Sequence, residues 1–153
     1  SRTSRWDIPG GVRRHSSLKP RMRGCGMNGH PVNLTIGAPA GFMNANHRHH
    51  WAARARDTRA WREAAWAHAR NENLAPRDRR ARVIVVFHHA DRRRRDVGNL
   101  APTAKAIVDG LTDAGLWPDD SDAHLVGPDL RTGEPWPRPG VEVLIEDAKE
   151  AAA

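Results

Sequence analysis

A continuous apolar run, Val83-Ile-Val-Val-Phe87, constrains the fold of this 153-residue chain more than any other segment. Most of its residues are β-branched and no polar residue interrupts it, which predicts a buried strand. A chain of this length forms one domain with a single modest core. The run therefore predicts one domain built around a central strand.

The segment after residue 99 predicts a helix at about 101–114. Its apolar residues recur at the spacing i, i+4, i+7, i+8 and i+11, at Leu100, Ala104, Ile107, Val108 and Leu111. Asn99 or Ala101 suits the N-terminal cap. Pro102 suits the first turn, and Gly115 suits the position just after the last one.

The same patterns predict the remaining elements. Strands are expected at 32–36, 83–87, 123–126 and 141–145, and a long loop rich in Pro and Gly at 128–140. A first helix is expected at about 55–72, where one face carries Trp61, Ala64, Ala65, His68 and Ala69. The order strand, helix, strand, helix, strand, strand predicts an α+β fold, with two helices packed on one face of a small mixed sheet.

The two ends of the chain differ from this folded part. Residues 1–30 are rich in Arg, Gly and Ser and lack apolar periodicity, so we expect a basic, weakly ordered N-terminal tail. Residues 31–147 form the predicted domain, and 148–153 a C-terminal tail. The single cysteine, Cys25, excludes an intramolecular disulfide and a cysteine-based zinc site.

The charge balance indicates the class of partner. The chain has 25 Lys and Arg against 18 Asp and Glu, a net charge of +7. Such a chain is attracted to polyanions, of which nucleic acid is the commonest. No apolar run approaches the length of a membrane span, and nothing resembles a signal peptide. We therefore expect a soluble, cytoplasmic protein with no membrane partner.

Four consecutive arginines, Arg92, Arg93, Arg94 and Arg95, lie directly after the apolar run. Guanidinium groups match the oxygens of a phosphate, so this run is a candidate DNA-binding segment. Alternate side chains of an extended segment point in opposite directions, so at most two of the four face one phosphate. The run also fits a solvated loop or a nuclear localisation signal.

Two aspartates flank the helix predicted at about 101–114. Carboxylates are the usual ligands of hard metal ions that hydrolyse phosphodiesters, which makes Asp96 and Asp120 candidate ligands. The helix is about 21 Å long, and residues 115–120 span at most about 20 Å. Asp120 therefore approaches Asp96 only if that segment runs back along the helix or if a partner copy supplies it. Alternatively, both aspartates are ordinary cap and loop residues.

Lys105 is the only lysine in the central part of a chain whose other lysines are Lys19 and Lys149. Arginine and lysine are not interchangeable at a phosphate or proton-transfer site, so Lys105 is either a residue with a chemical role or a surface lysine.

The histidines form two groups: His47, His49 and His50, then His88 and His89. They contain no helical H-x-x-x-H pair, so we expect polar surface residues facing DNA rather than metal ligands.

Taken in order, these residues form a composite motif: D-R-R-R-R-D-x-x-N-L at 91–100, Lys105, D-G-L at 109–111, and A-G-x-W-x-D-D at 114–120. The motif resembles that of the RusA-type Holliday junction resolvases, which are small, basic endonucleases encoded by phages and prophages. The close match covers about 30 residues. The order of elements matches over about 32–146, so residues 31–147 resemble a RusA-like endonuclease domain.

The resemblance implies a homodimer that cuts four-way DNA junctions with Mg²⁺ or Mn²⁺. It implies that Asp96 and Asp120 are metal ligands and that Lys105 is a catalytic or phosphate-contacting cation. It also places Asn46 and Arg48 near DNA. The implied location is the cytoplasm of a bacterial or phage-infected cell, in association with DNA.

The chain departs from the family pattern at two places. Gly98 occupies the position of the second carboxylate of the family's D-x-D-N, and the segment from Leu100 to Lys105 is longer by about one helical turn. A substitute ligand is then required, and the candidates are Asp119, Asp122, Asp91 and the Asn99 amide oxygen. Asp119 ranks first because it adjoins Asp120.

Gly98 also keeps a second function open. A chain that has lost a metal-ligand carboxylate fits a non-catalytic, basic nucleic-acid-binding protein. A generic basic adaptor is a third possibility and predicts no preference for junctions over linear duplex at equal salt.

Overall fold

The computed structural model describes residues 29–48 and 50–149. Most of the expected N-terminal tail, Cys25, His49 and the end of the C-terminal tail lie outside the described residues. The elements are β1 (Val32–Gly37), α1 (Trp51–Asn71), β2 (Ala81–His88), the 3-10 helix η1 (Val97–Leu100), α2 (Ala101–Asp113), β3 (Leu125–Thr132) and β4 (Gly140–Asp147).

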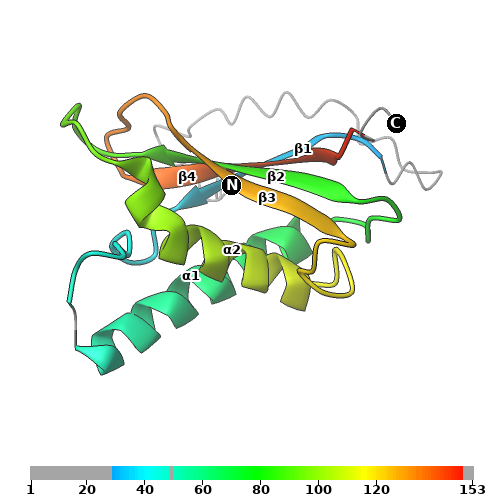
Figure 1. Ribbon diagram of the computed structural model, residues 1–153, viewed down its shortest axis with the longest axis horizontal. Coiled ribbons are helices and arrows are strands. Elements are labelled where there is room, and N and C mark those ends of the chain that lie inside the picture. Colours follow the sequence, from blue (N-terminus) through cyan, green and yellow to red (C-terminus); the bar gives the residue numbers. More distant parts are fainter. Residues whose placement is uncertain (1–28, 49, 150–153) are drawn as a thin grey trace, which may run out of the picture.

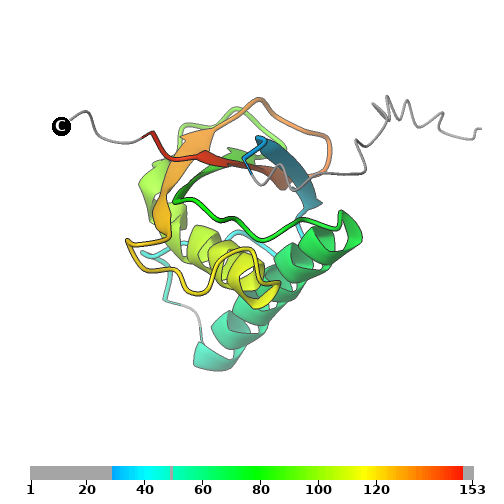
Figure 2. The same cartoon turned by 90° about the vertical axis from the view of Figure 1, so that its right-hand side faces the viewer.

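The four strands form one mixed sheet in the order β1-β4-β2-β3. β2 pairs in parallel with β3 and antiparallel with β4, and β4 pairs antiparallel with β1. Both helices lie on the same face of the sheet (Figure 1, Figure 2). The predicted α+β class, the element order and the mixed sheet are confirmed.

The apolar run predicted as a central strand lies within β2, between β3 and β4. Val83, Val85 and Phe87 have no solvent exposure and belong to a core that includes residues of both helices. Ile84, which alternation places on the opposite face, is also buried. The prediction of a buried central strand is confirmed.

α2 follows its predicted course, and all five residues of the predicted apolar stripe are buried. Gly115 has φ of +89°, the left-handed conformation expected just after a helix. The helix begins at Ala101 as predicted, but its N-cap residue is Leu100, which lies between Asn99 and Ala101 and makes no side-chain cap hydrogen bond. The 3-10 helix η1 precedes it, and Asp96 caps η1 by accepting a hydrogen bond from the Gly98 amide at 2.9 Å.

α1 begins at Trp51, four residues before the predicted start. Its first turn was not predicted because it carries no apolar stripe, and Trp51 is exposed. His50 caps this turn, and its Nδ1 accepts the Ala52 amide at 3.3 Å. The α1 residues buried in the core are Trp61, Ala65 and Ala69. Among the described residues, no helix is long and apolar enough to cross a membrane.

β3 is longer than predicted. It covers Leu125–Thr132, so the strand expected at 123–126 was too short and the loop expected at 128–140 shrinks to 133–139. Gly127 and Pro128 suggested a loop, but β3 is an edge strand, where the missing amide N–H of proline is tolerated. Gly127 has φ of +100°, and the register with β2 shifts close to this point.

One end of the sheet gathers the loops that carry most candidate residues. β1, β2 and β3 end there and β4 begins there, because β4 runs antiparallel to β1 and β2. The β1–α1 loop (38–50), the β2–η1 loop (89–96) and the β3–β4 loop (133–139) all meet this end. Asn46, Arg48 and the four arginines therefore share one end of the molecule.

Candidate active site and nucleic-acid interface

The arginine loop, residues 91–96, is organised by the Asp91 carboxylate. Asp91 Oδ1 accepts hydrogen bonds from the Arg93 amide at 3.0 Å and from Arg95 Nη1 at 2.7 Å. Arg93 Nε also lies 3.6 Å from Asp91 Oδ2. Arg92 and Arg94 are exposed and make no ion pair with another described residue. Two of the four guanidinium groups are thus turned toward Asp91, as the alternation of an extended segment predicts.

The pairing within this loop predicts a pH-dependent contact. The Arg95 hydrogen bond, followed by the Arg93 amide, lowers the pKa of Asp91 from 3.8 to about 2. The contact is therefore fully formed above about pH 4 and is lost as the pH falls through about 2. We expect Arg95→Gln to return the pKa of Asp91 toward 3.8, measured by NMR titration of its carboxyl carbon. The matched control is Arg92→Gln, and an Asp91 pKa unmoved by Arg95→Gln would contradict the described contact.

Gly98 acts through its backbone. Its amide donates a hydrogen bond to Asp96 Oδ1. A Cβ at this position would lie 3.2 Å from the same oxygen, which is shorter than most Cβ contacts in proteins. The Gly98 amide thus fixes the orientation of the Asp96 carboxylate.

The β1–α1 loop braces the start of α2. The Ala45 amide donates to the Asn99 carbonyl at 2.8 Å, and Thr103, which is fully buried, hydrogen-bonds the backbone of the same loop. Asn46 and Arg48 are exposed on this loop. The structure therefore places the loop that carries Asn46 and Arg48 beside Asn99, which the sequence separates by about 50 residues.

Lys105, Asp109 and Asp120 form an exposed group of charges that we call the α2 cluster. Lys105 Nζ donates to Asp109 Oδ1 at 2.7 Å, one helical turn away, and also to Asp120 Oδ2. Asp120 reaches Lys105 because the chain reverses at Gly115 and runs back along α2. The sequence required the segment after α2 to run back along the helix if Asp120 was to approach Asp96. The segment does run back, and it brings Asp120 as far as Lys105.

Two buried residues fix this return path. Leu116 and Trp117 are 2% and 3% exposed. Trp117 Nε1 donates to Thr112 Oγ1 at 2.6 Å, and the Leu116 amide donates to the Leu111 carbonyl at 3.3 Å. The position of Asp120 therefore depends on core packing rather than on a free loop.

The contacts within the α2 cluster favour the charged forms of Lys105 and Asp120. Hydrogen bonds to Asp109 and then to Asp120 raise the pKa of Lys105, and the Lys105 hydrogen bond lowers the pKa of Asp120. The side chains are 58% exposed at Lys105 and 40% at Asp120, so water screens these contacts and their effect on stability is small. Asp109 was not predicted as a site residue, although its i,i+4 spacing from Lys105 indicated the contact.

Asp96 lies apart from the α2 cluster, and no ion pair joins it to another residue of the described chain. It precedes Lys105 by nine residues, a rise of about 15 Å through η1 and the first turn of α2. Two oxygens bound to one Mg²⁺ lie at most about 4 Å apart. One ion therefore reaches both Asp96 and Asp120 only if a second copy supplies one of them or if the arginine loop rearranges.

The donor chemistry of the α2 cluster suits a hard divalent cation. Mg²⁺ is commonly held by one or two carboxylates together with waters and substrate phosphates, and Asp109 and Asp120 supply two. Within residues 29–48 and 50–149, no group of three or more His, Cys, Asp or Glu side chains is placed to hold a metal. Asp119, the first-ranked substitute for the carboxylate absent at Gly98, accepts the Ser121 amide at 2.9 Å instead.

The consecutive histidines His88 and His89 have different environments. His88 is 4% exposed, so the expectation of a polar surface residue was wrong for it. Its Nδ1 lies 2.7 Å from the Glu134 carbonyl, and its Nε2 lies 2.7 Å from Glu142 Oε1. His89 packs edge-on against Phe42, and burial lowers its pKa.

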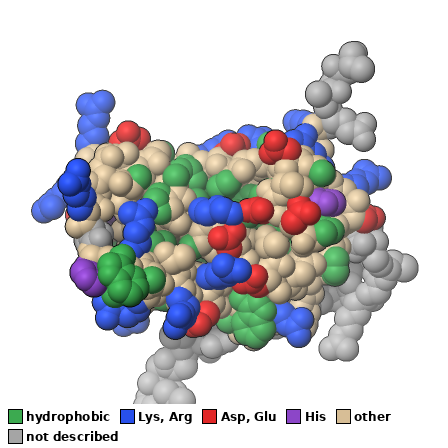
Figure 3. Space-filling model, turned by 60° about the horizontal axis from the view of Figure 1, so that its bottom comes forward, with side chains coloured by type: hydrophobic (Ala, Val, Ile, Leu, Met, Phe, Trp, Pro, Cys, Tyr) green, Lys and Arg blue, Asp and Glu red, His purple; other side chains and the backbone are tan. Residues whose placement is uncertain are grey.

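The surface over the helices carries both signs of charge. Acidic and basic side chains are intermixed across its middle (Figure 3). Basic side chains crowd toward the left-hand end of this view. That is the end at which η1 begins in Figure 1.

Comparison with known proteins gives no assignment, because no family model matches the chain and no curated protein matches it. The candidate site therefore consists of the α2 cluster, the arginine loop and the segment from Asp96 to Asn99.

Proposed function

We propose that this protein is a metal-dependent, structure-specific DNA endonuclease that cleaves phosphodiesters at four-way (Holliday) junctions in recombination or repair. The observation that carries the proposal is the contact of Asp120 with Lys105 across 15 residues of sequence. Both residues belong to the motif by which the chain resembles the RusA-type resolvases. Their approach on an exposed face supports a shared chemical role.

The α2 cluster contains the groups that phosphodiester hydrolysis needs. Asp120 and Asp109 would hold Mg²⁺ or Mn²⁺, which would supply an activated water and neutralise charge on the phosphoryl oxygens. Lys105, whose pKa is raised by its hydrogen bonds to Asp109 and Asp120, carries a protonated ammonium group at neutral pH. When a phosphate oxygen replaces a carboxylate as its partner, that ammonium stabilises the charge that develops on the phosphoryl group.

The other candidate residues hold the DNA. Arg92 and Arg94 project from the arginine loop without a carboxylate partner among the described residues, which leaves them available for phosphates. Asn46 and Arg48 contact the strand that passes the start of α2, where the backbone of Asn99 anchors their loop. These contacts are largely electrostatic, so binding weakens as salt rises.

A homodimer completes the proposal. A pair of copies related by a two-fold axis matches the symmetry of a four-way junction and places one site on each of two strands. It would also let Asp96 of one copy reach a metal held at Asp120 of the other without a rearrangement of the arginine loop.

A junction cleavage assay tests the proposal. A four-way junction is labelled on each strand in turn and incubated with the full chain, with and without Mg²⁺ or Mn²⁺, beside a linear duplex of the same sequence. We expect paired symmetric nicks in two strands of the junction that require the metal, and no nicks in the duplex.

The second candidate, a non-catalytic nucleic-acid-binding protein, is favoured by Gly98 and predicts a different result. Junction binding without nicking in either metal would replace the endonuclease by this candidate. Equal binding to junction and duplex at the same salt concentration would exclude structure-specific recognition of either kind.

A further inference from the structure

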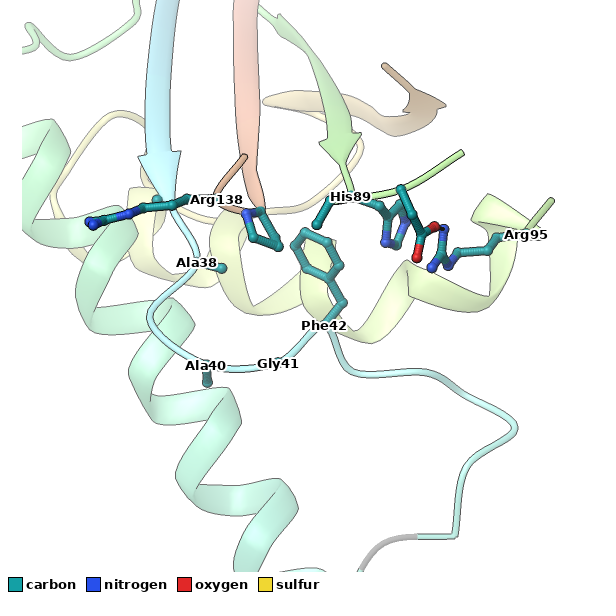
Figure 4. Close-up of a pocket in the computed structure, with 11 residues that line it drawn as sticks. Ala38, Ala40, Gly41, Phe42, His89, Arg95 and Arg138 are labelled. Atoms are coloured by element: carbon teal, nitrogen blue, oxygen red, sulfur yellow. Dashed lines mark hydrogen bonds and ion pairs between the residues drawn. The ribbon is translucent and has the colours of Figure 1, made fainter. Parts of the chain in front are cut away.

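A cavity of about 600 Å³ opens at the end of the sheet, between the β1–α1 loop and the arginine loop. Residues 38–42 curve along one side of it, and His89 and Arg95 stand on the other (Figure 4). Its volume lies within the range of about 300–1,000 Å³ that is common for small-ligand sites. No residue that lines it has a role in the α2 cluster.

The floor of the cavity is apolar and aromatic. The ring of Phe42 is held in place by two neighbours. Trp61 stacks on it with 5.5 Å between the ring centroids, and Phe87 packs edge-to-face with 5.3 Å between the centroids. The centroid of the His89 ring lies 4.9 Å from that of Phe42. Ala38 and Ala40 line the cavity with small side chains. Such a rigid aromatic surface suits a flat, apolar-faced group.

The rim of the cavity is basic. Arg95, held by Asp91, stands on one side, and Arg138 stands on the other with its side chain extended outward (Figure 4). A second cavity of about 360 Å³ lies beside the arginine loop and is lined in part by Arg92, Arg93 and Arg95. The loop therefore separates an apolar cavity from one lined by several guanidinium groups.

We propose that the cavity beside Phe42 receives one unstacked nucleobase of the DNA strand that the arginine loop holds. Nucleobases stack on aromatic side chains, and guanidinium groups pair with the phosphates on either side of a base. Inorganic phosphate alone does not use the aromatic floor, and an apolar ligand does not use the basic rim. A nucleotide within a strand uses both.

Because of where the cavity lies, a base bound in it helps to select the phosphodiester that is cleaved. Arg95 adjoins Asp96 in the sequence, so a base in the cavity lies near one of the proposed metal ligands. Extruding a base costs least where pairing is already weak, as at a strand crossover. The inference rests on the proposed function for this role, whereas base binding itself needs neither metal nor cleavage.

The test compares two DNA trinucleotides that carry equal phosphate charge: d(TTT) and the same molecule with an abasic middle residue. Each is titrated into the full chain without metal, and amide NMR shifts are followed. We expect d(TTT) to shift the amides of Ala38, Gly41 and Ala90, which line the cavity. We expect it to bind about tenfold more tightly than the abasic molecule, because stacking on one aromatic side chain has an effect of this size.

Two variants separate base recognition from phosphate binding. Ala40→Phe fills the cavity and is expected to reduce d(TTT) affinity to that of the abasic molecule. Arg138→Ala leaves the core intact and is expected to weaken both molecules by a similar factor, since it removes only rim charge. Arg79→Ala, at an exposed arginine near the opposite end of β2, is the matched control and is expected to weaken them less.

Equal affinity of the wild type for the two trinucleotides would overturn the inference and leave only a phosphate site at the arginines. A change of oligomeric state in Ala40→Phe with unchanged d(TTT) binding would assign the cavity to a contact between copies and also overturn it. Nicking in Ala40→Phe with unaltered base preference would overturn it while leaving the proposed function in place. A wild type that binds d(TTT) selectively but never nicks would support it and remove only the proposed function.

Discussion

Asp120→Asn is expected to reduce metal-dependent nicking of a four-way junction by about 10²-fold or more while junction binding persists. The substitution keeps the size of the side chain and removes the charge that pairs with Lys105 and is proposed to hold the metal. Loss of one negative charge near the DNA leaves binding unchanged or slightly tighter. Nicking rates come from denaturing gels, and binding is measured on the same junction without metal.

The matched control for this variant is Asp78→Asn. Asp78 is exposed and precedes β2, at the opposite end of the sheet from the arginine loop, and its substitution changes the net charge equally. We expect Asp78→Asn to nick at the wild-type rate. If Asp120→Asn also nicked at that rate, the α2 cluster would have no part in the chemistry.

Gly110→Ala is expected to lower the free energy of unfolding by about 2 kcal/mol or more, because α1 and α2 are in close contact there. A Cβ at Gly110 would lie 2.2 Å from the Arg62 carbonyl oxygen and 2.9 Å from Ala65 Cβ. The two helices must then separate and unpack the core between them. The better helix propensity of alanine offsets about 1 kcal/mol of this loss at most.

Urea unfolding measures this effect, and Gly37→Ala provides the control. A Cβ at Gly37 meets no atom within 4 Å, so the same substitution adds a methyl group in open space. We expect the unfolding midpoint to change little in Gly37→Ala and to fall clearly in Gly110→Ala. A Gly110→Ala protein as stable as the wild type would mean that the helices do not approach as described.

Periodicity allowed most of the fold to be predicted, because the spacing of apolar residues reports which side of an element is buried. The stripe from Leu100 to Leu111 and the run from Val83 to Phe87 were therefore placed correctly. β3 was misjudged because Gly127 and Pro128 suggest a loop unless the edge position of the strand is known. The first turn of α1 was missed because its side chains face solvent.

The candidate site could be predicted less completely. The order of Asp96, Asn99, Lys105 and Asp120 is visible in the sequence, but the contact of Lys105 with Asp120 depends on how Leu116 and Trp117 pack. The cavity could not be predicted, since loops from three parts of the chain form it. Local sequence patterns do not reveal such contacts between distant parts of the chain.

The central claim is that a divalent metal binds at Asp120 and Asp109 of one copy and that Asp96 of the second copy serves the same ion. Titration of Mn²⁺ followed by electron paramagnetic resonance tests it, with the full chain as wild type, Asp120→Asn, Asp96→Asn and the Asp78→Asn control. The account predicts saturable Mn²⁺ binding to the wild type and the control, and clearly weaker binding to the other two. Identical titration curves for the wild type and Asp120→Asn would contradict it.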